Sequence, residues 1–171
     1  MRFANFLMIL VMCTTGAAWS NELHGEALAS RWELAGTSDE EKQRLQAIDS
    51  ATEHLPRFKR GRARDMLAGR TAPPQSLTIS LEGSTVTIGS AGRELELELG
   101  GPPIEASGDQ GKAQVSARME GEQLIVEADG GKGVRTSEYR ADGDRLSVEV
   151  TMTGARLAEP LNYVSTYERV E

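Results

Sequence analysis

The sequence predicts a mainly β protein in which an N-terminal pair of helices precedes an antiparallel meander that forms a barrel or a strongly curled sheet. Two observations predict this fold class. After Pro74, apolar and polar residues alternate with a period of two in a series of short segments, as in strands that have one dry face. Before Pro74, apolar residues recur at helical spacing instead. A meander of about eight strands avoids exposed edges when it curls and closes.

The first twenty residues have the organisation of a signal peptide. A positive start, Met1-Arg2, precedes an apolar run over 3–13 that is too short to span a membrane. Small residues then support a cut before Asn21 or, alternatively, before Trp19. We expect residues 1–20 to be removed and the mature chain, which has no transmembrane segment, to be secreted or periplasmic.

The remaining 151 residues are enough for one domain with a single core. Removal of 1–20 takes away one arginine and the only cysteine, so an acidic chain of net charge -8 remains. Without cysteine it has no disulfide, no thiol nucleophile and no thiolate-bound zinc. We expect an N-terminal segment with two helices over 21–74 and the meander over 75–171, both within one domain.

Two helices are predicted before Pro74. The run Ser38-Asp39-Glu40-Glu41 fits a capping box, and the helix that it starts, over about 39–54, ends before Pro56 because a residue that precedes proline avoids the helical region. A second helix, over about 57–68, ends near Gly69.

The strands of the meander are defined by their alternating apolar residues. These are Leu77/Ile79/Leu81, Val86/Ile88, Leu95/Leu97/Leu99, Val115/Ala117/Met119, Leu124/Val126, Leu146/Val148/Val150/Met152 and Leu161/Tyr163/Tyr167. Turn pairs that favour tight hairpins separate several of them, because each pair includes a glycine that can adopt positive φ. The pairs are Glu82-Gly83, Glu120-Gly121, Asp129-Gly130 and Asp142-Gly143.

Several of these segments resemble the lipocalin superfamily (calycin-like proteins), nearest to fatty-acid-binding-protein-like barrels. The resemblance rests on Trp32-Glu33-Leu34 before a helix pair, LTISLEGSTVTI (77–88), VSARMEGEQL (115–124), ADGDRLSVEVTM (141–152) and TYERV (166–170). It implies a lipocalin-like barrel that holds a lipid beneath a helical lid.

The chain departs from this family at the anchor for a fatty-acid carboxylate. Tyr167 matches the tyrosine of the last strand, but Ser165 stands where the family has an arginine, and a second family arginine would fall near Ser137. A neutral or bulkier ligand, or no ligand, is more consistent with this pattern than a fatty acid bound in the family's manner.

No catalytic residue, metal site, cofactor or nucleic-acid partner is expected. His24 and His54 have no cysteine or spaced carboxylate partner that would complete a zinc site. The glycine-containing segments 108–113 and 130–133 fall between strands, whereas phosphate-binding loops precede a helix.

The sequence thus favours a protein that acts by binding, and two hypotheses stay open. The first is a carrier or sensor of a small hydrophobic ligand, with Leu97, Val148, Tyr163 and Tyr167 in the barrel interior. The alternative is an envelope protein-protein interaction module with a filled core and no ligand.

The second predicted helix contains a basic stripe, Arg57, Arg60 and Arg64, in a segment of net charge +5. The apolar residues Phe58, Ala63, Met66 and Leu67 lie broadly opposite and are expected to pack. Two partners are consistent with the stripe: the acidic remainder of the molecule, notably the start of the first helix, or an anionic membrane surface or envelope polymer contacted transiently.

Overall fold

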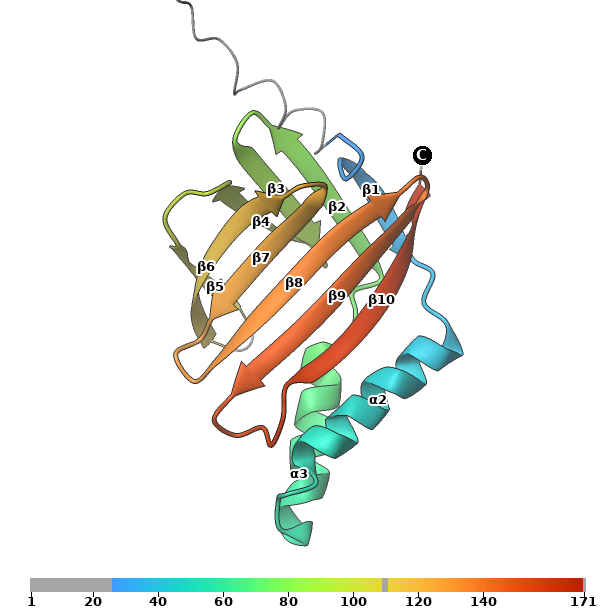
Figure 1. Ribbon diagram of the computed structural model, residues 1–171, viewed down its shortest axis with the longest axis vertical. Coiled ribbons are helices and arrows are strands. Elements are labelled where there is room, and N and C mark those ends of the chain that lie inside the picture. The colour runs from blue at the N-terminus through green and yellow to red at the C-terminus, as the bar shows by residue number, and fades with distance from the viewer. Residues whose placement is uncertain (1–25, 109–110, 171) are drawn as a thin grey trace, which may run out of the picture.

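The computed structural model describes residues 26–108 and 111–170, and the predicted cleavage sites and His24 lie outside them. Within these residues, a helix pair and a ten-stranded antiparallel sheet form a nearly closed barrel (Figure 1). The fold class predicted from the sequence is therefore confirmed. The elements are β1 (Ser30–Leu34), α2 (Ser38–Thr52), α3 (Arg57–Thr71), β2 (Ser76–Glu82), β3 (Thr85–Ser90), β4 (Arg93–Glu98), β5 (Ile104–Gly108), β6 (Gly111–Glu120), β7 (Gln123–Asp129), β8 (Gly133–Asp142), β9 (Arg145–Gly154) and β10 (Leu161–Val170).

The barrel closes through its first and last strands. β1 lies between β10 and β2, with Leu34 opposite Tyr167 and Trp32 opposite Leu77. The two edge strands of the sheet are β4 and β5, and the end of β4 approaches β6. There Leu99 forms a bridge with Ala117 of β6, and the backbone N–H of Gly100 donates to the Ala117 carbonyl over 2.8 Å.

The sheet has one dry face, as the alternation predicts, and seven strands follow the predicted segments. Two strands of the meander, β5 and β8, were not predicted. β8 was missed because Arg135 and Ser137 occupy inward positions where the pattern requires apolar residues. β5 is short, and its one large apolar residue, Ile104, is exposed.

Three of the four predicted turns have positive φ at the expected glycine: Gly83, Gly121 and Gly143. In the turn between β7 and β8, Gly131 adopts positive φ instead of Gly130. Its N–H donates to the side chain of Asp129 over 2.7 Å, which holds the longer turn.

Helix α2 begins one residue earlier than predicted. The hydroxyl of Thr37, not Ser38, caps it by accepting the N–H of Glu40. The Glu40 carboxylate does not complete a capping box; it accepts hydrogen bonds from the Oγ1 (2.6 Å) and N–H (3.3 Å) of Thr166, and so docks α2 on β10.

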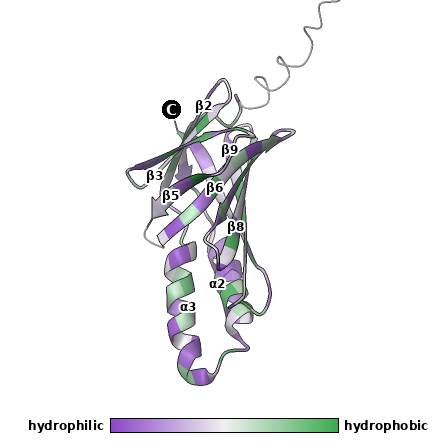
Figure 2. Cartoon of the chain, turned by 90° about the vertical axis from the view of Figure 1, so that its left-hand side faces the viewer, coloured by the Kyte–Doolittle hydropathy of each residue, from purple (hydrophilic) through white to green (hydrophobic). Residues whose placement is uncertain are grey.

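Helix α3 continues through Gly69 to Thr71 and packs on α2, while both helices extend beyond one end of the barrel (Figures 1 and 2). Of the four residues expected to form its packing face, only Leu67 is buried. Phe58 is 81% exposed and Met66 45%. The predicted apolar face is therefore wrong in extent, because α3 packs mainly on α2 within the described residues.

Candidate ligand-binding site in the barrel

The four residues predicted to line the interior are all buried within one core cluster. Val148 lies on β9, and Tyr163 and Tyr167 lie on the neighbouring strand β10. Leu97 comes from β4, in the other half of the sheet, so both halves contribute to the same interior.

Sequence reasoning missed one polar residue of this interior, Arg135. It shares the inward face of β8 with Tyr139 and stands opposite Ala128 of β7 and Met152 of β9. Its Nε is buried and has no hydrogen-bond partner among the described residues. The alternation that runs back from Tyr139 through Ser137 to Arg135 is the signal that would have found it.

Three tyrosines lie in the electrostatic field of Arg135. Burial raises the pKa of Tyr139, Tyr163 and Tyr167 above the ordinary value, and the positive charge of Arg135 partly opposes this rise. The phenols are therefore protonated at neutral pH and can donate hydrogen bonds into the interior.

The positions of the family's arginines are occupied by buried serines. Ser165 and Ser137 face the interior, each 5% exposed. A cation is nevertheless present, because Arg135 lies two residues along β8 from Ser137. The interior thus combines an apolar surface with a few polar groups, as small-molecule sites do.

The predicted basic stripe faces the C-terminal half of α2, not its acidic start. Arg64 forms an ion pair with Asp49 (2.5 Å), and Arg60 donates to the carbonyls of Glu53 and, over 3.2 Å, Leu55. Arg57 is exposed. These three residues do not approach the four interior residues; they belong to the helix pair.

At the acidic start of α2, Glu41 has a partner from the same helix. Its carboxylate accepts hydrogen bonds from Nε (2.9 Å) and Nη2 (2.7 Å) of Arg44. These bonds hold the pKa of Glu41 below its ordinary value.

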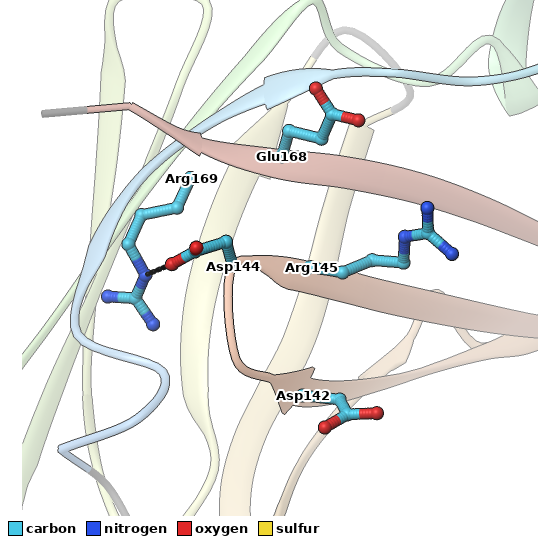
Figure 3. A pocket seen from close by; sticks show the side chains of 5 residues that line it. All are labelled: Asp142, Asp144, Arg145, Glu168 and Arg169. Atoms are coloured by element: carbon cyan, nitrogen blue, oxygen red, sulfur yellow. Dashed lines mark ion pairs between the residues drawn. The ribbon is translucent and has the colours of Figure 1, made fainter.

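Two open grooves on the described surface lie outside the barrel interior. One, of about 380 Å³, is lined by Asp142, Asp144, Arg145, Glu168 and Arg169 (Figure 3). There Arg169 pairs with Asp144 (3.5 Å) and stacks on Trp32. The other, of about 290 Å³, lies between the helices beside Arg60 and Arg64.

The described residues hold no cluster of three or more histidine, cysteine, aspartate or glutamate side chains that would suit a metal ion. Neither helix in the described part of the chain has the length and apolar character of a membrane-spanning segment.

Comparison with known proteins places the fold among calycin-like barrels. A secretory abundant heat soluble protein from Ramazzottius varieornatus is 14% identical, with a TM-score of 0.56 over 85% of this chain and 97% of that one. Lipid binding protein 8 of Caenorhabditis elegans is 13% identical, with a TM-score of 0.54 over 85% and 96%. Fatty-acid-binding protein 1 of Echinococcus granulosus is 19% identical, with a TM-score of 0.53 over 85% and 99%.

These likenesses show that the chain shares the barrel fold of these proteins. No family model matches the chain, and no curated protein does. At these levels of identity, the shared property is the fold.

Proposed function

We propose that this protein is an exported, non-catalytic carrier or sensor of a small hydrophobic molecule bound inside the barrel. One observation carries the proposal: Arg135 lies on the inward face of β8, in an interior that is otherwise mainly apolar, and its Nε is buried without a hydrogen-bond partner among the described residues. Buried polar groups without protein partners are costly, and a ligand that supplies those partners offsets the cost.

Two further observations support a site in the barrel. Arg135 and its neighbours Ala128 and Met152 are only partly buried, whereas Val148 and Val150 further along β9 are buried. Solvent therefore reaches the inward face near Arg135. Several similar solved structures are, by their descriptions, fatty-acid- or lipid-binding proteins, which is consistent with the same use of this fold.

The second candidate is an envelope interaction module with a filled core. It is supported by two open grooves that lie on the outside of the molecule, one at the ends of β8, β9 and β10 and one between the helices. In that case the partner would be another protein that contacts the outer face or the helices.

Native mass spectrometry of protein purified from its own host separates these candidates. A co-purifying mass of lipid size that dissociates on unfolding is the result expected for a carrier. Bare protein that also fails to bind hydrophobic molecules offered in vitro would contradict the carrier and favour the module.

Export is part of the proposal and rests on the signal-peptide pattern of 1–20. Intact-mass measurement on protein recovered from outside the cytoplasm should give a chain that begins at Asn21 or Trp19. A chain that retains 1–20 would contradict export through a cleaved signal.

We further propose that the helix pair makes transient contact with an anionic membrane surface or envelope polymer through Arg57, Arg60 and Arg64. Exposed side chains of α3 support this surface, since Phe58 stands out from the helix beside Lys59 and Arg57. Basic residues near an anionic surface contribute about 1 kcal/mol each. Arg60 and Arg64 already have partners on α2, so contact by the free cations would be weak and salt-sensitive.

A further inference from the structure

Helix α3 has an exposed face that is directed away from α2. The buried residues of α3, Leu67 and Thr71, lie on its other side, where Thr71 accepts a hydrogen bond from Arg44 of α2 over 2.6 Å. The exposed face is formed by four residues at spacings of four, three and four, which keeps them in one line along the helix. These residues, here called the outer face of α3, are Phe58, Arg62, Asp65 and Gly69.

The outer face of α3 carries a large apolar side chain, one charge of each sign and an open space. Phe58 is 81% exposed at the first of the four positions. At the last position, a Cβ added to Gly69 would meet nothing within 4 Å. Between them, Arg62 and Asp65 are exposed, and neither forms an ion pair with a residue that the structure describes. The face therefore offers a partner an apolar projection, a cation, a carboxylate and a gap, in that order.

This order of residues is complementary to itself when two α3 helices run antiparallel. With a twofold axis midway between Arg62 and Asp65, each Arg62 faces the Asp65 of the other helix. The same axis sets each Phe58 against the Gly69 of the other helix. Each ring then occupies the space beside a residue without a side chain, and each cation meets a carboxylate. A parallel pair would instead place like charges together, which is unfavourable.

The place of α3 in the molecule leaves room for such a pair. Both helices extend beyond one end of the barrel, and α3 begins at the tip that is farthest from the barrel and ends beside it (Figures 1 and 2). An antiparallel pair therefore places the two barrels at opposite ends of the paired helices. Gly61, which lies beside the outer face, also has no atom within 4 Å of an added Cβ, so the two backbones can approach closely. Met66, which is 45% exposed, adds apolar surface on the other side.

We propose that the outer face of α3 binds a second copy of this chain, as an antiparallel pair in which Phe58 packs beside Gly69 and Arg62 pairs with Asp65. This inference does not depend on what the barrel interior holds. The paired surface is short, so the association is weak and reversible. The net charge of +5 on each segment 57–70 opposes association, and salt at physiological concentration screens that repulsion.

Exchange of the two central charges tests the pair and its register. Arg62→Glu leaves two acids at the centre and Asp65→Arg leaves two bases, so each variant alone should self-associate at least about tenfold more weakly than the parent. An equimolar mixture of the two variants, and the double variant Arg62→Glu/Asp65→Arg, should associate as the parent does. Analytical ultracentrifugation at physiological salt, without lipid and up to about 1 mM protein, measures this. Arg70→Glu is the matched control, since Arg70 is exposed on α3 but lies off the outer face.

Each other outcome overturns the proposal. A parent that stays monomeric at the highest concentration does not pair through α3. If the parent dimerises and the single charge variants dimerise equally well, another surface holds the dimer. If the mixed variants fail to associate although the parent does, Arg62 does not face Asp65. Thermal unfolding of each variant shows that it is folded, so that a loss of association is not a loss of structure.

Discussion

Arg44 illustrates how a single charged side chain organises the helix pair. It is only 6% exposed, whereas the neighbouring Leu45 is 40% exposed. Its Nη1 donates to Oγ1 of Thr71 (2.6 Å) and to the carbonyl of Ala68 (2.9 Å), and its other nitrogens contact Glu41. Arg44 therefore joins α2 to acceptors in the last turn of α3.

Replacement of Arg44 by Met should destabilise the protein by about 1–3 kcal/mol. The methionine retains the apolar stem but leaves the buried acceptors at Ala68 and Thr71 without a donor. Urea unfolding followed by circular dichroism measures this loss. Glu41→Gln is the control, since an ion pair with a half-exposed carboxylate contributes at most about 1 kcal/mol. If Arg44→Met is as stable as the parent, the hydrogen bonds from Arg44 to α3 do not contribute to the stability of the protein.

The ion pair between Arg44 and Glu41 also predicts that the free energy of unfolding depends on pH. The folded pKa of Glu41 is lower than that of the unfolded chain, so its contribution is fully present above the ordinary glutamate value and is lost as the pH falls through the lowered folded value. The difference in stability between the parent and Glu41→Gln should be small, constant near neutral pH and vanishing in acid. A difference that persists in acid would assign the effect to something other than ionisation.

At the scale of elements, the helices and strands that could be predicted are those with a regular apolar pattern and recognisable turn residues. Both helices and seven strands of the meander follow from local pattern. β8 could not be predicted in that way, because Arg135 and Ser137 break the apolar alternation on the very face that becomes the interior. β8 and Arg135 were therefore missed for one physical reason: a polar group lies inside, where packing alone would favour an apolar one.

The exposed position of α3 predicts a stabilising change. Gly61 lies within the helix, and a Cβ added there would meet nothing within 4 Å. Gly61→Ala should therefore stabilise the helix by about 0.5–1 kcal/mol through the lower backbone entropy of alanine. Hydrogen exchange should show slower exchange of α3 amides. The matched control is Gly83→Ala, which also has open space but requires positive φ and should be destabilising.

The proposed anionic-surface contact also belongs to this scale. The parent should sediment with anionic vesicles at low salt, less so at high salt, and not with neutral vesicles. A double change of Arg57 and Lys59 to Glu should abolish this at little cost in stability, because both side chains are exposed. Phe58→Ser tests the apolar contribution.

The change of Arg57, Arg60 and Arg64 together to Glu is the informative comparison, since it also removes the ion pair to Asp49 and the contacts to the end of α2. It should lower thermal stability as well as vesicle binding. If the parent fails to sediment with anionic vesicles at low salt, the basic stripe serves only to hold α3 against α2 through Arg60 and Arg64.

At the scale of the whole molecule, larger side chains at buried interior positions distinguish an interior that accepts a ligand from a filled core. Leu97→Trp or Val148→Trp should weaken binding of an environment-sensitive apolar dye at little cost in stability if the interior accepts a ligand. In a filled core the same changes overpack and cost about 1–3 kcal/mol. Dye fluorescence and thermal unfolding, measured on the same samples, distinguish these two cases. A parent that binds no dye, together with destabilised variants, would favour the interaction module.

The pairing of β1 with β10 has a consequence for the order in which the molecule assembles. The first strand and the helix that follows it find their main neighbours in the last ten described residues: Leu34 opposite Tyr167, and Glu40 bound to Thr166, 126 positions further along the chain. Until β10 has been synthesised, β1 lacks one of its two neighbours and the helix pair has no strand to dock against. Such distant contacts form late because chain closure must be completed first. The barrel of a nascent chain therefore remains unclosed until β10 has emerged from the ribosome.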